Sequence, residues 1–85
     1  MLLPKANKTN FVKLLREKGF SVPSIQQAQL TKSGHTFFLR WTDPDRVSHT
    51  AYYTGAGGRP VLQVDKQWFD LTMVEVIHFG LVEEK

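Results

Sequence analysis

Hydrophobic and polar residues alternate most clearly in the middle of the chain, between residues 35 and 42. The odd positions of this stretch are Phe37, Leu39 and Trp41, and the even positions are Thr36, Phe38, Arg40 and Thr42. Such alternation, rich in aromatic and β-branched side chains, predicts a β-strand with two different faces. Turn-forming residues at 33–34 and 43–45 predict a hairpin at each end. The odd positions are expected to face the core.

Pairing places a strand on each side of this central strand. Residues 24–31 also suit a helix, but a two-residue turn at Ser33-Gly34 sets Leu30 opposite Phe37 and favours a strand. On the other side, a four-residue connection sets Arg40 opposite His49. The second face of this three-stranded meander is then predicted to present Gln27, Gln29, Phe38, Arg40, His49, Ala51 and Tyr53. A slip of one residue would exchange the faces of a strand.

A short first helix is predicted from the spacing of Phe11, Leu14 and Leu15, which fall on one helical face. Thr9 or Asn10 is the expected N-terminal cap, because their side-chain oxygens accept hydrogen bonds from free backbone N–H groups. Gly19 stands where a left-handed residue ends a helix, and Phe20 is expected to fold back onto Leu15.

A second helix is predicted over 73–79. Thr72 and Glu75 have the spacing of a capping box, in which each side chain accepts a hydrogen bond from the other residue's backbone N–H. Leu71 and Val76 stand at the positions of the accompanying hydrophobic contact, and Gly80 ends the helix. Two further strands are expected before it, at 60–64 and 68–71.

These elements predict an α+β fold: an antiparallel β-meander of four to five strands with a short N-terminal and a short C-terminal helix. At 85 residues, the chain is expected to form one small domain. Residues 1–8 are expected to be a loose basic arm, because Pro4 and a polar run precede the first helix. Residues 82–85 are expected to fray.

Composition narrows the classes of function. There is no cysteine, which excludes disulfides, thiolate metal sites and cysteine nucleophiles. No apolar run approaches the ~20 residues of a membrane span, and the N-terminus lacks a signal peptide pattern, so a cytoplasmic location without a membrane partner is expected. The net charge of +3 is a mild basic bias, and Lys13, Arg16 and Lys18 concentrate it on the first helix.

The case for catalysis is weak. His35, His49 and His78 fall beside a turn, in a strand and in a helix, and their spacing matches no metal motif. The glycine-rich segment 54–60 leads into a strand rather than a helix, so a hairpin loop is favoured over a phosphate-binding loop. We therefore expect no enzyme activity, no metal and no cofactor.

Two hypotheses of function remain. In the first, the second sheet face binds nucleic acid weakly: Phe38 and Tyr53 stack on bases, Arg40 contacts phosphate, and the basic helix extends the surface. In the second, the same face serves a protein-interaction module or a small inhibitor of phage, plasmid or gene-cassette type, since aromatic residues and arginine also anchor protein interfaces. A third reading leaves no site at all, because a helix covers that face as a second half-core.

Overall fold

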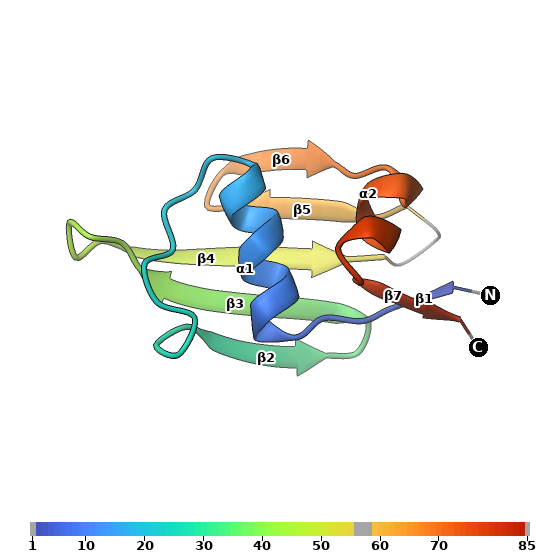
Figure 1. Cartoon of the computed structure of the whole chain (residues 1–85), viewed down its shortest axis with the longest axis horizontal. Coiled ribbons are helices and arrows are strands. Elements are labelled where there is room, and N and C mark those ends of the chain that lie inside the picture. Colours follow the sequence, from blue (N-terminus) through green and yellow to red (C-terminus); the bar gives the residue numbers. More distant parts are fainter. Residues whose placement is uncertain (1, 56–58, 85) are drawn as a thin grey trace.

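The computed structural model describes residues 2–55 and 59–84 of the chain. The elements in chain order are β1 (Leu2–Pro4), α1 (Lys8–Glu17), β2 (Gln29–Ser33), β3 (Thr36–Thr42), β4 (Ser48–Thr54), β5 (Val61–Val64), β6 (Gln67–Asp70), α2 (Met73–His78) and β7 (Val82–Glu84). Strands β2 to β6 form one antiparallel sheet in which sequence neighbours are also spatial neighbours (Figure 1). The predicted meander with two short helices is therefore confirmed.

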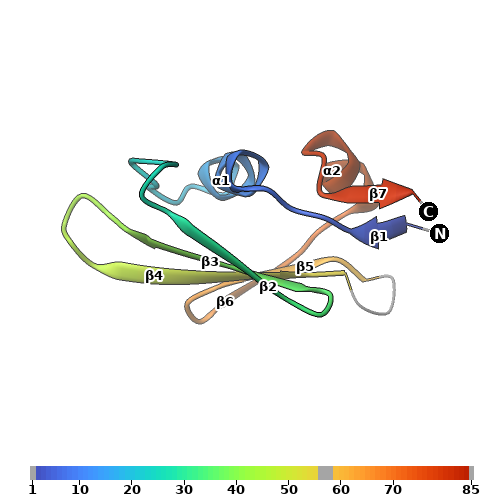
Figure 2. The ribbon, with the colours of Figure 1, turned by 90° about the horizontal axis from the view of Figure 1, so that it is seen from below.

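Both helices lie on the same side of the five-stranded sheet, and the other side is left uncovered by any described element (Figure 2). The core lies between the helices and the sheet. Its strand residues are Phe37, Leu39, Trp41, Ala51, Tyr53, Leu62 and Val64, and its α1 residues are Phe11, Val12, Leu14 and Leu15. The predicted burial of Leu39 and Trp41 is confirmed. None of the described helices is long and apolar enough to span a membrane.

The ends of α1 were predicted in part. The helix begins earlier than expected, because Asn7 rather than Thr9 or Asn10 is the cap: its Oδ1 accepts a hydrogen bond of 2.8 Å from the Asn10 N–H. At the other end, Gly19 has a φ of +96°, in the left-handed region. The N–H groups of Gly19 and Phe20 donate to the carbonyls of Arg16 and Leu15, which is the predicted glycine-terminated helix end.

Helix α2 forms as its local sequence predicts. The Glu75 N–H donates to Thr72 Oγ1 at 3.1 Å, and the Thr72 N–H donates to Glu75 Oε1 at 3.2 Å, so both halves of the capping box are present. Val76 is fully buried and Leu71 nearly so. Gly80, at φ +68°, ends the helix, and the Leu81 N–H donates back to the Val76 carbonyl.

The first hairpin has a two-residue turn as predicted, but the turn lies one residue further along the chain. The turn residues are Gly34 and His35, and Leu30 pairs with Leu39 rather than with Phe37. Because this shift is two residues, the faces of the strand are preserved. Residues 25–27 form a turn instead of the start of a strand, and β2 begins only at Gln29.

The second hairpin is shifted by one residue, which corrects the face assignment of β4. Residues 43–47 connect the strands, one residue more than expected, because Arg46 takes a left-handed φ of +66°. His49 therefore pairs with Trp41, and Tyr53 pairs with Phe37. The side chains of His49, Ala51 and Tyr53 point toward the helices.

The two ends of the chain also differ from expectation. Leu2–Pro4 pairs with Val82–Glu84 in a separate two-stranded antiparallel sheet, where a loose arm and a frayed tail were predicted. The Leu81 carbonyl holds this small sheet to the rest of the molecule: it accepts hydrogen bonds from the Lys5 N–H at 2.8 Å and from the Tyr53 hydroxyl at 2.7 Å. Such long-range pairing leaves no trace in local sequence patterns.

The glycine-rich segment 54–60 connects β4 to β5. Its middle, 56–58, lies outside the described residues. The strands on either side are antiparallel neighbours, with Thr54 opposite Val61, so the connection joins a hairpin. A helix does not follow it, as the sequence indicated.

Candidate binding face

The uncovered side of the sheet carries a row of large side chains in register. Phe38 on β3 pairs with Tyr52 on β4, Tyr52 pairs with Gln63 on β5, and Gln63 pairs with Trp68 on β6. Residues that pair across strands point to the same side of a sheet. Phe38, Tyr52 and Trp68, the aromatic row, therefore lie along one line that crosses four strands, over three interstrand spacings of about 4.8 Å.

Solvent reaches this row. Trp68 is 68% exposed, and Phe38 and Tyr52 are half-buried. The Phe38 and Tyr52 rings meet edge to face, with centroids 4.9 Å apart and an interplanar angle of 81°. This mutual contact holds two of the three rings in a fixed relative orientation.

A polar hollow lies at one end of the same face. Its volume is about 200 Å³, and it is lined by Gln27, Gln29, Arg40, Trp41, Thr42 and Ser48. Gln29 pairs with Arg40 across β2 and β3, two residues along the strands from the pair that Phe38 makes with Thr31. The structure thus brings together four predicted residues: Gln27, Gln29, Phe38 and Arg40.

Three predicted members of this face, His49, Ala51 and Tyr53, lie on the other side of the sheet. The one-residue slip of β4 is the physical reason, because it exchanges the two faces of that strand. Tyr53 is completely buried against Phe37, with ring centroids 6.1 Å apart. Burial raises the pKa of its hydroxyl to about 12, and that hydroxyl donates to the Leu81 carbonyl. Tyr53 is therefore a core residue.

Tyr52 and Trp68 are the members of the face that sequence reasoning missed. Tyr52 is the neighbour of Tyr53, so the correct register alone would have identified it. Trp68 was placed in a strand without an assigned face. Its signal was the alternation of β6, where Trp68 and Asp70 share one side of the sheet and Phe69, half-buried against Phe20, has the other.

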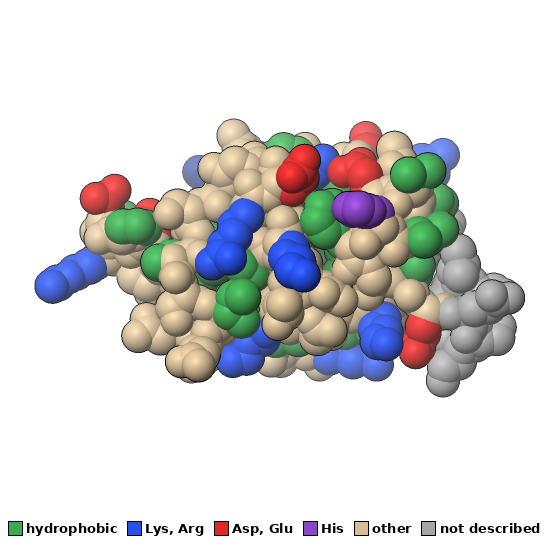
Figure 3. All heavy atoms as spheres, viewed as in Figure 1, with side chains coloured by type: hydrophobic (Ala, Val, Ile, Leu, Met, Phe, Trp, Pro, Cys, Tyr) green, Lys and Arg blue, Asp and Glu red, His purple; other side chains and the backbone are tan. Residues whose placement is uncertain are grey.

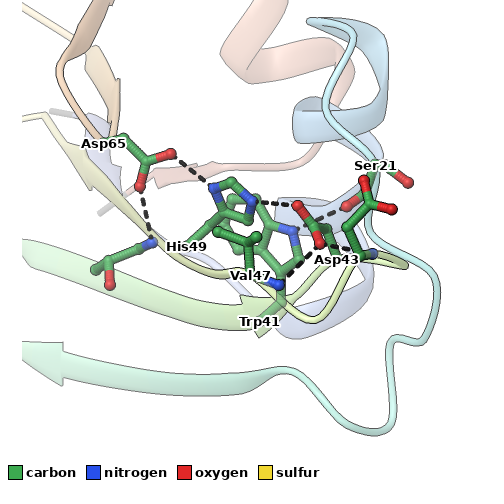
Figure 4. A network of polar contacts seen from close by, with 8 residues as sticks. Ser21, Trp41, Asp43, Val47, His49 and Asp65 are labelled. Carbon is green, nitrogen blue, oxygen red and sulfur yellow. Dashed lines mark hydrogen bonds and ion pairs between the residues drawn. The ribbon is translucent and has the colours of Figure 1, made fainter.

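His49 occupies a polar network at the edge of the core (Figure 4). Its Nε2 lies 2.7 Å from Asp43 Oδ2, and its Nδ1 lies 2.7 Å from Asp65 Oδ2. Its ring stacks on Trp41, with centroids 5.3 Å apart, and the Trp41 indole N–H donates to the Ser21 carbonyl at 2.9 Å. The expected neighbour of His49 was Arg40, and the register replaces it with Trp41.

The hydrogen bonds of this network stabilise the charged forms of His49 and Asp43. The hydrogen bonds to Asp43 and then Asp65 raise the pKa of His49, because both carboxylates stabilise the imidazolium. The bond to His49, together with the N–H of Val47, lowers the pKa of Asp43. Both ring nitrogens of His49 are engaged by these hydrogen bonds. His49 therefore fits a structural role, linking the 43–47 connection to the β5–β6 turn, better than the role of a general base.

The predicted basic helix does not extend the open face, because α1 lies on the opposite side of the sheet (Figure 2). Figure 3 shows Lys and Arg side chains over α1 on that helical side. Arg16 donates from Nε and Nη2 to the Val22 carbonyl, at 3.2 and 2.6 Å. Lys18 forms a 2.7 Å ion pair with Glu75, which lowers the pKa of that carboxyl. Lys13 is exposed.

Within residues 2–55 and 59–84, no group of three histidine, aspartate or glutamate side chains is arranged to hold a metal ion. Comparisons with protein-family models, with curated proteins and with solved structures find no match.

Proposed function

We propose that this protein binds single-stranded nucleic acid weakly through the open face of its sheet. The observation that carries the proposal is the aromatic row, Phe38, Tyr52 and Trp68, in register on a face that no described helix covers. Planar bases stack on such side chains whatever their sequence, and proteins that bind single strands commonly combine an open sheet with aromatic residues.

The polar hollow supplies charged and hydrogen-bonding groups, which such binding needs besides aromatic rings. The Arg40 guanidinium suits a phosphate or the face of a base, and the amides of Gln27 and Gln29 suit the donor and acceptor groups on base edges. A strand laid along the aromatic row would pass the hollow beside Phe38. In this arrangement, stacking supplies most of the affinity and Arg40 supplies position.

The charges of the face set the expected affinity. Among the described strand residues whose side chains point to the open side, Arg40 is the only cation, and Asp70 is an anion. Phosphate attraction is therefore modest. With one phosphate neutralised by Arg40, the logarithm of the affinity for a single strand should fall with log salt at a slope of only about −0.7.

The same balance of charge favours a second candidate, a protein-interaction module. A face with three aromatic rings, one arginine and little net charge has the composition of a protein-interface centre. In this alternative, the polar hollow around Arg40 receives a carboxylate or a backbone carbonyl of the partner. The two candidates use the same residues but respond differently to oligonucleotides and to salt.

A titration against labelled single-stranded and duplex oligonucleotides at low salt tests the proposal. Phe38→Ala and Tyr52→Ala should each cost ~1–3 kcal/mol of binding free energy on single strands. Ile77→Ala is the matched control, because Ile77 is an exposed apolar residue on α2, away from the open face. Arg40→Ala should weaken binding, whereas Lys13→Ala, a cation on the other side of the sheet, should leave it nearly unchanged.

Thermal unfolding of each variant establishes that losses of binding are not losses of fold. No binding at protein concentrations on the order of 100 µM, the range of weak non-specific affinities, would contradict the proposal. The protein-interaction candidate would then stand. Equal losses for Arg40→Ala and Lys13→Ala would instead mean that the binding is general electrostatic attraction without a site.

A further inference from the structure

The two edges of the five-stranded sheet differ in how they are protected. In the part of the chain that the structure describes, β2 and β6 each have a strand neighbour on one side only. The free backbone groups of an edge strand can pair with another chain, and a charged side chain on the edge, especially a lysine, discourages this. Strand β2 has Lys32 and one apolar residue, Leu30, whereas β6 has no lysine and two adjacent aromatic residues, Trp68 and Phe69.

Hydrogen bonds show which backbone groups of β6 point outward. The Leu71 N–H donates to the Pro60 carbonyl, so this pair is a hydrogen-bonded pair of the β5–β6 ladder. Such pairs alternate along antiparallel strands. Phe69 and Gln67 therefore bond to β5, and the N–H and C=O groups of Trp68 and Asp70 point away from the sheet.

We infer that β6 pairs with β6 of a second copy of this chain, antiparallel across a two-fold axis at Phe69. In this register, Trp68 of each copy exchanges both backbone hydrogen bonds with Asp70 of the other. The two Phe69 residues face each other at the axis. An antiparallel pair of identical strands satisfies the same groups in both copies, as a closed two-fold dimer requires.

The side chains suit this register. On the open face, each Trp68 lies opposite Asp70 of the other copy, so no like charges oppose each other. On the helical side, the Phe69 pair forms a cross-strand aromatic contact. Lys18 lies there, with its Nζ 6.0 Å from the centroid of the Phe69 ring, and its ion pair with Glu75 compensates its charge. Two copies can therefore approach without an uncompensated charge at the axis.

Exposed apolar area points to the same part of the molecule. Among the side chains that the structure describes, the exposed large hydrophobic residues are Val47, Trp68, Met73, Val74 and Ile77, and all but Val47 belong to β6 or α2. Figure 3 shows apolar side chains gathered over α2. Strand β6 has only four residues, so the interface is small and the dimer should be weak. Pairing would also join the two open faces into one continuous surface.

Sedimentation equilibrium of the protein alone tests the inference. The apparent mass should rise from 9.8 kDa toward twice that value as the concentration passes on the order of 100 µM. Amide exchange identifies the edge, because the N–H groups of Trp68 and Asp70 should exchange more slowly at high concentration. The outward N–H groups of β2, those of Leu30 and Lys32, serve as the internal control and should exchange at an unchanged rate.

Charge substitutions test the register. Trp68→Glu should abolish the rise in mass, because each new carboxylate would lie opposite Asp70 of the other copy. Adding Asp70→Lys should restore it, since every opposed pair then has opposite charges. Thr31→Glu is the matched control: it places the same carboxylate on the open face at the β2 edge, and the protein should still dimerise.

A single-chain mass up to about 1 mM would overturn the inference. So would a dimer in which Leu30 and Lys32, rather than Trp68 and Asp70, gain amide protection. The inference is independent of the proposed function, because these measurements contain no nucleic acid, and Phe38→Ala should weaken oligonucleotide binding without changing the apparent mass.

Discussion

The two faces of the sheet are built from alternate residues of the same strands, and both carry aromatic side chains. On the covered face, Phe37 and Tyr53 stack and are buried beneath α1. On the open face, Phe38 and Tyr52 meet edge to face and reach solvent. The difference lies in what covers them rather than in their chemistry. Aromatic content identifies a strand but does not tell which of its faces is the core.

Adjacent residues on β3 give the largest test of this comparison. Leu39→Ala should lower the free energy of unfolding by about 2–5 kcal/mol, because it leaves a cavity in the covered core. Phe38→Ala should lower it by no more than about 1 kcal/mol, because Phe38 is only half-buried on the open face. Chemical denaturation measures both. Equal losses would mean that the two faces do not differ in burial.

The next test weakens the element that covers one end of the core. Thr72→Ala should lower the free energy of unfolding by about 0.5–2 kcal/mol, because it frees the Glu75 N–H at the start of α2. Thr72→Ser keeps the hydroxyl and should unfold close to the native protein. Thermal unfolding of the pair is sufficient, and similar losses for both variants would mean that the capping hydrogen bond contributes nothing.

Two neighbouring tyrosines, one on each face, allow the faces to be compared by removing a single hydroxyl group. Tyr53→Phe should cost about 0.5–1.5 kcal/mol of stability, because it removes the buried hydrogen bond to Leu81. Tyr52→Phe, on the open face, should cost less than about 0.5 kcal/mol. Alkaline titration gives a second readout. Since the pKa of Tyr53 is raised to about 12, its stabilising contribution should persist below pH 10 and disappear as pH rises through 12.

The smallest expected effect concerns the His49 network at the rim of the covered face. The pKa of His49 is raised, so its contribution to stability should be complete below about pH 6.5 and should fall as pH rises through the raised value. The pKa of Asp43 is lowered, so its contribution should fall as pH drops below 3.8. In unfolding experiments across this pH range, His49→Gln should lack the fall in stability that accompanies the deprotonation of His49. An unchanged profile in that variant would show that His49 is not its source.

Local sequence predicted those parts of the fold that local chemistry determines. The alternation of β3, the capping box at Thr72 and the helix ends at Gly19 and Gly80 each depend on residues within a few positions of one another. The register of β4 depends on the length of the connection before it, which is one residue longer than predicted. Asp43 Oδ1 accepts N–H groups from Asp45 and Val47, and with Arg46 left-handed this makes a five-residue connection. Asp43 was recognised as a turn residue, but the length of its turn was not.

For the same reason, the sequence predicted only part of the candidate site. Phe38 and Arg40 were identified because they belong to β3, whose faces follow from its own alternation. The sequence predicts Tyr53 in the position that Tyr52 holds, because the length of the turn before β4 decides which residues of β4 face the open side. Trp68 was missed because its place beside Tyr52 follows only from pairing across β5. Long-range register is the information that local patterns do not contain.

The pairing of β1 with β7 bears on the order in which the protein folds. Every connection within the five-stranded sheet is a hairpin between sequence neighbours, so the entropy of closing each loop is small. The β1–β7 pair instead joins opposite ends of the chain. Contacts of this kind form slowly and add little to an early folding nucleus, so the meander should assemble first and the terminal pair last. The same pair should open first in the native protein, exchanging its amide protons while the central strands stay protected.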